Sequence, residues 1–559
     1  MRIKSTLLCG VAAGIFAAAA LGGGVAEAKV AKADQTQAQI DDLRAQIQFL
    51  KDRLDEQAAI SQKANADLKT AQNQAAAAQA QAAASAQVAA AQAQIIQTIP
   101  AEVKKEVAAN KPKNDKAYYK GISITMGGFA AAESVYRDRD ETADIGSSYS
   151  KIPFATDAAS HTGETHLTAR QSRYSILAQG DVSKDLDAAF YGEFDFLGAA
   201  QTANSNQSNS YQPRIRNLYG EANWKDEGIH VLVGQNWSLL TLNSKGITPR
   251  NEVPPPTIDA SYVPGFAWAR QPQVRLVKDF NKEVWVGVSL ENPQTTFSGS
   301  AAAGGVTVTN NQAPTSQYFN GTNYSLNQYP DVIGKVALEK HIGDHTLHAE
   351  VEGIFRSYMD RVNIAAGSAA TTLGYAAGNT TQNTNGGGAG GSITFDLVPK
   401  RLDLQGSFLA GTGIGRYGAA GLPDTTVGPN GSLKPIPETM FLAGATLHAT
   451  PQLDFYVFGG GEFEGQKTYL VGGKVVGYGS TVASNAGCIT ELGSCSAVTK
   501  SIDQIAAGFW DKAFTGPFGQ IRVGLQYSYT ERKTFNDNTG FGPKVNENMV
   551  FTSFRYYPF

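Results

Sequence analysis

Several arginines of this sequence occupy positions from which they could recognise a negatively charged solute. They are Arg173, Arg216, Arg270, Arg275 and Arg522. A guanidinium stays charged at physiological pH and binds a carboxylate or phosphate through two parallel hydrogen bonds. Acidic residues such as Glu193 and Asp259 accompany the arginines. The pattern therefore fits either a path for anions or a set of ion pairs that only stabilise the protein.

Other chemistry has little support in the residue patterns. The sequence contains no GxSxG, HExxH or phosphate-binding glycine loop, so we expect no enzyme activity and no cofactor. His341, His345 and His348 are close in sequence, but two flank a turn and one lies on a strand face, so we expect no metal site. The 47 Lys and Arg residues nearly balance the 50 Asp and Glu residues, which gives no reason to expect a nucleic-acid partner.

The elements that must position the arginines are strands, because polar and apolar residues alternate. In one segment Leu347, Ala349 and Val351 share one face, and His348 and Glu350 share the other. A soluble β-sandwich turns its apolar face inward, whereas a transmembrane barrel turns it toward lipid. Alternation alone does not separate these two folds.

The lengths of the connections favour a barrel. The predicted strands are 121–137, 166–182, 185–197, 212–225, 228–241, 270–280, 283–291, 331–342, 345–356, 391–398, 401–411, 437–449, 452–463, 501–512, 517–530 and 547–559. Short turns such as Ser183-Lys184 and Thr515-Gly516 alternate with long loops such as 292–330, 357–390 and 464–500. This alternation is typical of bacterial outer-membrane barrels. Residues 120–559 are therefore predicted to form an all-β transmembrane barrel of about 16 antiparallel strands.

A short α-helical coiled coil is expected before the barrel. Residues 1–28 have the positive start, apolar centre and small-residue cleavage site of a signal peptide. Residues 29–70 contain an apolar seam with spacings of three and four, formed by Ile40, Leu43, Ile47, Leu50 and Leu54. It predicts a periplasmic coiled coil, with a single solvated helix as the alternative. Residues 71–119 follow as an Ala/Gln-rich helical spacer and linker.

Only Cys488 and Cys495 remain after removal of the signal peptide. In an oxidising compartment, two cysteines this close in sequence are expected to close a small loop through a disulfide.

The segment 242–269 between the fifth and sixth predicted strands contains five prolines, together with Arg250, Glu252 and Asp259. Prolines reduce the entropy cost of fixing a long loop. We therefore expect the segment to fold into the barrel and narrow it. The alternative is an ordered loop on the surface.

Three short motifs carry a family resemblance. They are Ala169-Arg170-Gln171-Ser172-Arg173, Val233-Gly234-Gln235-Asn236-Trp237 and Arg270-Gln271-Pro272-Gln273-Val274-Arg275. With the exported coiled coil, the spacer and the barrel, the sequence resembles the DcaP-like trimeric outer-membrane porins. The resemblance implies a homotrimer that passes small, often anionic solutes.

The expected function is passive diffusion of small hydrophilic solutes across the bacterial outer membrane, with a preference for anions such as small carboxylates. Outer-membrane lipid and lipopolysaccharide are then the expected surroundings of the barrel. One alternative is a sugar-selective porin with a path lined by aromatic rings, for which Tyr191, Trp237, Trp285 and Trp510 are candidates. Another is a barrel enzyme or adhesin with a plugged lumen.

Overall fold

The computed structural model describes residues 116–198, 212–298, 304–308, 327–479 and 484–559, together with the single residues 51 and 69. All but these two single residues belong to the unit Lys113–Phe559. The predicted signal peptide and nearly all of the predicted coiled coil and spacer lie outside the described residues. The fold below is therefore that of the predicted barrel region.

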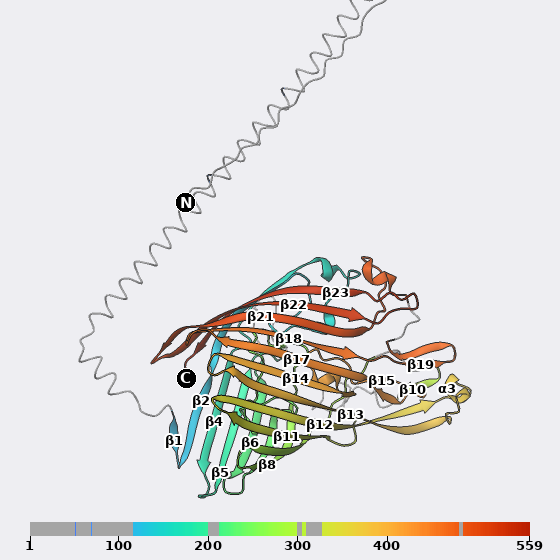
Figure 1. Ribbon diagram of the computed structural model, residues 1–559. Coiled ribbons are helices and arrows are strands. Elements are labelled where there is room, and N and C mark those ends of the chain that lie inside the picture. Colours follow the sequence, from blue (N-terminus) through green and yellow to red (C-terminus); the bar gives the residue numbers. More distant parts are fainter. Residues whose placement is uncertain are drawn as a thin grey trace, which may run out of the picture. The chain divides into compact units, whose positions relative to one another are not determined.

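Among the described residues, long antiparallel strands form one closed barrel (Figure 1). They are β2 (Ile122–Arg137), β4 (Arg173–Asp181), β5 (Leu186–Asp195), β6 (Arg214–Trp224), β7 (Ile229–Trp237), β8 (Arg270–Phe280), β9 (Val284–Glu291), β11 (Asp331–Ile342), β12 (His345–Ile364), β13 (Gly378–Val398), β14 (Leu402–Thr412), β17 (Pro437–His448), β18 (Leu453–Glu464), β21 (Thr499–Gly516), β22 (Gly519–Thr534) and β23 (Lys544–Tyr557). Each of these strands pairs with the next, and β2 closes the barrel by pairing with both β4 and β23. The predicted barrel of 16 antiparallel strands is confirmed.

Shorter elements extend the barrel or lie in its loops. They are β1 (Ala117–Tyr119), β3 (Glu164–Thr168), β10 (Val306–Val308), β15 (Thr425–Val427), β16 (Leu433–Pro435), β19 (Lys467–Val471), β20 (Lys474–Tyr478), α3 (Ala369–Thr372), η1 (Tyr149–Lys151), η2 (Ala158–His161), η3 (Gly415–Tyr417) and η4 (Ala486–Ile489). No helix in the described part of the chain has the length and apolar character needed to cross a membrane.

The faces of the strands follow the predicted alternation. On β12, Val351 is 67% exposed on the outside of the barrel, and His348 and Arg356 are fully buried on the inside. On β8, Val274 and Leu276 are exposed, whereas Arg275 is buried. Successive side chains of a strand point to opposite faces of the sheet. The barrel therefore presents an apolar outer face and places its charged residues in the lumen.

The barrel has a turn end and a loop end. At the turn end, two to four residues join each pair of strands, as at 343–344 and 281–283. The last of these turns was predicted at Thr515-Gly516, but β21 runs through Gly516 and the turn falls at 517–518. The predicted strand 166–182 is interrupted between β3 and β4, where the Ser172 hydroxyl accepts a hydrogen bond from the Ala131 amide.

The segment predicted as a long loop at 357–390 is mostly strand. β12 continues to Ile364 and β13 starts at Gly378, so the two form an extended hairpin. Polar cross-strand pairs support it: Arg361 donates to the Thr381 hydroxyl at 3.0 Å, and Asn363 donates to Asn379 at 2.9 Å. Both faces of this extension carry polar residues, which is why the search for apolar alternation missed it.

Candidate functional site

Loop 238–269 lies between β7 and β8 and folds into the barrel. This inward path was predicted for the proline-rich segment 242–269. One part packs Tyr262, Val263 and Phe266 against inner-wall residues that include Trp510 and Phe551. An earlier part packs Leu239, Leu240 and Ile247 against a separate group of wall residues that includes Trp285 and Ile333. These five residues and their neighbours form a second apolar cluster. The loop therefore has apolar contacts with more than one side of the lumen.

The polar wall also holds the backbone of loop 238–269. The indole Nε1 of Trp510 donates to the Pro256 carbonyl at 2.8 Å. The side-chain amide of Gln405 donates to the Val253 carbonyl at 2.9 Å. Prolines cannot donate backbone hydrogen bonds, but their carbonyls remain acceptors. Donors on β14 and β21 therefore fix the loop along its proline run.

A second loop, residues 413–436, also enters the lumen. The amide of Trp268 donates to the Tyr417 carbonyl at 3.1 Å, and Ala267 forms a β-bridge with Gly418. Ile414 and Tyr417 belong to the same apolar cluster as Leu239. Sequence analysis predicted inward folding only for the proline-rich segment and did not identify this loop. Its signal was the concentration of apolar residues between Ile414 and Leu422 in a segment expected to be loop.

A third segment, loop 138–163, fastens loop 238–269 at Asp259. The Asp259 carboxylate accepts from the Ser147 amide at 3.1 Å, the Ser147 hydroxyl at 2.7 Å and the Tyr149 hydroxyl at 3.3 Å. It also accepts from the Ser261 amide at 2.8 Å. Asp259 is 1% exposed, and this burial raises the pKa of its carboxyl above the ordinary value despite these donors. Asp259 therefore connects two loops in the lumen.

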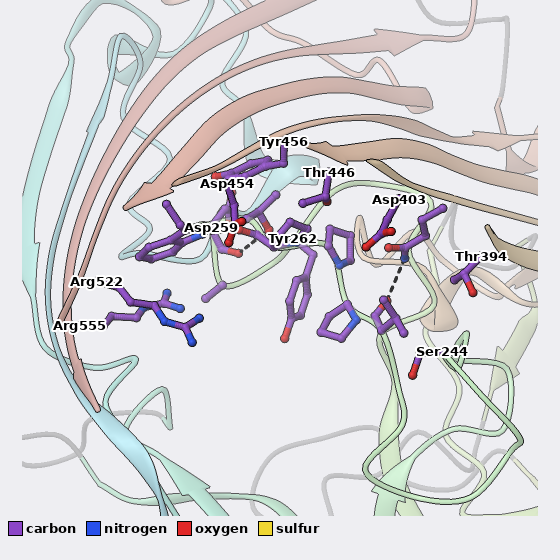
Figure 2. A pocket seen from close by; sticks show the side chains of 18 of the residues that line it. Ser244, Asp259, Tyr262, Thr394, Asp403, Thr446, Asp454, Tyr456, Arg522 and Arg555 are labelled. Atoms are coloured by element: carbon purple, nitrogen blue, oxygen red, sulfur yellow. Dashed lines mark hydrogen bonds between the residues drawn. The ribbon is translucent and has the colours of Figure 1, made fainter. Parts of the chain in front are cut away.

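Beside loop 238–269 lies a cavity of about 550 Å³ (Figure 2). Arginines from β4, β6, β22 and β23 line one side; they are Arg173, Arg216, Arg522 and Arg555. Aspartates from β13, β14 and β18 line another side; they are Asp396, Asp403 and Asp454. Figure 2 shows Arg522 and Arg555 separated from Asp403 by residues of the loop. The cavity therefore has a basic side and an acidic side.

Two of the predicted arginines meet at Glu193. Arg216 donates to Glu193 at 2.6 Å and to Asp195 at 3.0 Å, and it is nearly buried. Arg173, the first residue of β4, lies 3.9 Å from Glu193 and is less buried. Arg214 makes two further hydrogen bonds to Asp195. Ion pairs thus neutralise part of the arginine charge. This agrees with the alternative interpretation, in which these charges form ion pairs that stabilise the protein.

The two predicted arginines of β8 occupy different surroundings. Arg270, the first residue of β8, places its guanidinium 4.7 Å from the ring centre of Trp237. Arg275 is buried and donates to Gln273 at 3.0 Å and to the Trp237 carbonyl at 2.5 Å. Neither residue lines the cavity. The structure therefore brings Arg173, Arg216, Arg522 and Asp259 to one cavity and leaves Arg275 away from it.

Three arginines act together on the loop residue Tyr262. Burial opposes ionisation of its phenol, yet the Arg216, Arg173 and Arg270 guanidiniums lower the pKa of Tyr262 below its ordinary value. The cause is the positive charge of these three side chains, of which Arg173 and Arg216 line the cavity with Tyr262. Glu193 and Asp195, which accept hydrogen bonds from Arg216, place negative charge beside the same arginines.

Arg555 is a cavity residue that sequence analysis did not select. The sequence feature that could have identified it is its position between Phe554 and Tyr556 in the last strand. Alternation along this strand puts Arg555 on the inner face. The aspartates of the acidic side were also missed. Each lies within three residues of a short turn, where alternation is hard to follow in sequence. No group of three or more His, Cys, Asp or Glu side chains within the described ranges could hold a metal ion.

Cys488 and Cys495 are joined by a disulfide in the loop that follows β20. Cys488 packs with Ile152, Phe154 and Val545, so the cystine lies over loop 138–163. The amide of Thr156 donates to the Cys488 carbonyl at 3.3 Å. The disulfide therefore stabilises contacts between loops at the loop end.

Changing both cysteines to serine is expected to loosen these loops without unfolding the barrel, because none of the strand pairings depends on the disulfide. The loss should be about 2–3 kcal/mol of local stability for so short a closed loop. Limited proteolysis should show faster cleavage near residues 484–498, with unchanged heat resistance of the barrel on gels. Two free thiols in unreduced protein purified from membranes would contradict the disulfide itself.

No protein-family model matches the sequence, and no curated protein is similar to it. The structure is similar to that of the outer-membrane channel DcaP of Acinetobacter baumannii, with a TM-score of 0.52, 17% sequence identity, and coverage of 78% of this chain and 98% of that chain. An anion-selective porin from Comamonas acidovorans aligns with a TM-score of 0.41 and 10% identity over 78% of this chain and 99% of that chain. The resemblance to the DcaP-like porins that the sequence motifs indicated is thus confirmed at the level of the fold.

Proposed function

We propose that the protein is an outer-membrane porin that lets small hydrophilic solutes diffuse passively and prefers anions. The observation that carries this proposal is the closed 16-stranded barrel with an apolar outer face and a charged lumen narrowed by loop 238–269. A barrel of this size is wide enough to leave an aqueous channel unless loops narrow it. The fold it shares with the DcaP channel supports the same function.

The preference for anions rests on the arginines around Tyr262. The guanidiniums of Arg216, Arg173 and Arg270 lower the pKa of this loop residue, which supports an excess of positive charge around it. An ion in a water-filled lumen senses a wall charge only within about 8 Å at physiological salt. The narrow region beside loop 238–269 is where a passing ion comes this close. Small carboxylates are among the anions that guanidinium groups recognise through paired hydrogen bonds.

The proposal includes the protein's surroundings. Its exposed belt of Val, Leu and Phe side chains fits lipid, so we place the barrel in the bacterial outer membrane among lipid and lipopolysaccharide. The short turns would then face the periplasm, together with the coiled coil of residues 29–70. We further propose a homotrimer, held by barrel walls and assisted by that coiled coil.

A sugar-selective porin has less support. Its path would need exposed aromatic faces, but Trp237 and Trp285 are 6% and 7% exposed and pack in apolar clusters. The guanidinium of Arg270 lies against the Trp237 ring. These rings therefore stabilise the loops rather than offer stacking surfaces. The remaining alternative is a barrel enzyme or adhesin with a plugged lumen. Absence of single-channel current would favour that alternative.

The test is the reversal potential of single channels in a KCl gradient. The wild-type channel should prefer chloride, and the double variant Arg173→Gln/Arg270→Gln should shift toward potassium. The shift should be larger near 0.1 M than near 1 M salt, because the screening length falls from about 10 Å to about 3 Å. Arg401→Gln, at an exposed turn outside the cavity, is the matched control. A wild-type channel that prefers cations would contradict the proposed anion preference. Absence of current in inserted protein would contradict the proposed porin function.

A further inference from the structure

The basic side of the cavity contains two arginines that face each other directly. Arg522 on β22 and Arg555 on β23 are cross-strand partners in the sheet register. Their guanidinium groups lie side by side and point toward the cavity in Figure 2. Like charges directly opposite each other on neighbouring strands destabilise a sheet. The pair therefore requires compensation by negative charge.

The protein compensates only one member of this pair. Arg555 lies 2.9 Å from the Glu133 carboxylate and donates to Gln171 at 3.0 Å. Arg522 donates to the neutral side chain of Gln520 and lies 4.5 Å from the Tyr557 ring centre. Within the described residues, no carboxylate forms an ion pair with Arg522. Its remaining donors are thus available to an anion in the cavity.

Stacking keeps the two guanidiniums in place. Arg555 lies close to two rings, at 4.6 Å from the centre of Trp510 and 4.7 Å from that of Phe129. Tyr557, which lies under Arg522, packs 5.1 Å from Phe129. A guanidinium that is already held by aromatic faces loses less freedom when it binds a ligand. The pair is therefore arranged for two-point binding of a carboxylate.

The other side of the cavity has the opposite character. Asp403 exposes 52% of its side chain, and Asp396 and Asp454 lie on the strands around it. Among the described residues, the basic groups that contact these aspartates are Lys512, at 2.9 Å from Asp454, and the His448 imidazole, at 2.7 Å from Asp454 and 3.1 Å from Asp403. Three carboxylates thus face one ammonium and one imidazole. This side repels a second anionic group and offers acceptors to a hydroxyl or an ammonium group.

We propose that the cavity binds short solutes that carry one carboxylate at one end and a hydroxyl or ammonium group at the other. Arg522 and Arg555 hold the carboxylate, and the opposite end of the solute lies toward the aspartates of β13, β14 and β18, whose negative charge acts across the cavity. Dicarboxylates of the same length bind less well, because their second carboxylate meets the acidic side. The cavity of about 550 Å³ has room for such a solute together with water. The inference rests on the proposed porin function and assigns its solute class.

The experiment measures how long single solutes interrupt the current of the wild-type channel in KCl. Three four-carbon probes differ only in their end groups: 4-aminobutanoate, succinate and the neutral 4-hydroxybutanamide. Interruptions by 4-aminobutanoate should last about three- to fivefold longer than those by the amide, which is the range expected for partly exposed charge pairs. Succinate interruptions should be shorter than those of 4-aminobutanoate.

Variants assign the effect to the two sides. Arg522→Gln should remove the advantage of 4-aminobutanoate over the amide, and Arg522→Lys should retain part of it. Asp403→Asn should lengthen succinate interruptions, while Arg401→Gln should change none of the three. The inference would be wrong if succinate gave the longest interruptions in conducting channels, or if Arg522→Gln had no effect. Either result would still agree with the proposed porin function. Absence of any current would instead overturn the porin, and the inference with it.

Discussion

Replacing Asp259 by alanine is expected to release loop 238–269 from loop 138–163 and to make the channel current unsteady. The substitution removes the acceptor of the Ser147 amide, the Ser147 hydroxyl and the Ser261 amide, while the Tyr149 hydroxyl keeps the Tyr262 carbonyl as an acceptor at 2.8 Å. A buried donor without a partner costs about 1–3 kcal/mol. Because several donors are affected together, the closed arrangement of the two loops should no longer dominate.

Single-channel recording measures the outcome directly. Asp259→Ala should broaden the distribution of conductance levels and raise current noise severalfold, while strand content by circular dichroism stays unchanged. Asp537→Ala is a matched control. Asp537 also accepts several hydrogen bonds, from Thr539 and from the Asn485 amide, but it lies in the loop between β22 and β23. If Asp259→Ala has the same steady conductance as Asp537→Ala, the hydrogen bonds to Asp259 do not hold the two loops in place in the lumen.

The barrel was predictable because its physical signals are local. A strand that separates lipid from a polar lumen must alternate with a period of two, so segments such as 347–356 could be assigned from sequence alone. Turn residues such as Gly343 and Asn281 adopt positive φ angles of 63° and 55°, which agrees with tight turns at the predicted places. The strand ends of β12 and β13 were missed because the alternation ends where the hairpin is polar on both faces.

The site was less predictable because its contacts are long-range. Asp259 was chosen as a charged residue of the inner loop, but its partners Ser147 and Tyr149 lie more than a hundred residues earlier. Arg522 and Arg555 become neighbours only through the register of β22 with β23. Alternation indicates which face a side chain occupies. It does not say which inward-facing charges meet, because that depends on register and on the paths of the inward loops.

Replacement of Arg356 by methionine is expected to have the largest effect on stability. This fully buried residue of β12 donates to Asp331 at 3.1 Å, to Asp424 at 2.6 Å and to the Gly413 carbonyl at 2.5 Å. Asp424 belongs to the inward loop 413–436, so Arg356 fixes that loop to the wall. Methionine fills similar space but leaves two buried carboxylates without this partner. Breaking a buried ion pair from one side costs about 3–5 kcal/mol.

The free energy of unfolding of the barrel in urea should therefore fall by about 3–5 kcal/mol, and conductance should rise as loop 413–436 leaves the wall. Arg401→Met, at an exposed turn, should change neither quantity. Arg356→Lys separates charge from geometry, because an ammonium group keeps the charge but cannot reach two carboxylates and a carbonyl in the fixed directions of a guanidinium. It should recover part of the stability and little of the loop attachment. A stable Arg356→Met channel with unchanged conductance would mean that the apolar contacts of Ile414 and Tyr417 hold the loop without the ion pairs.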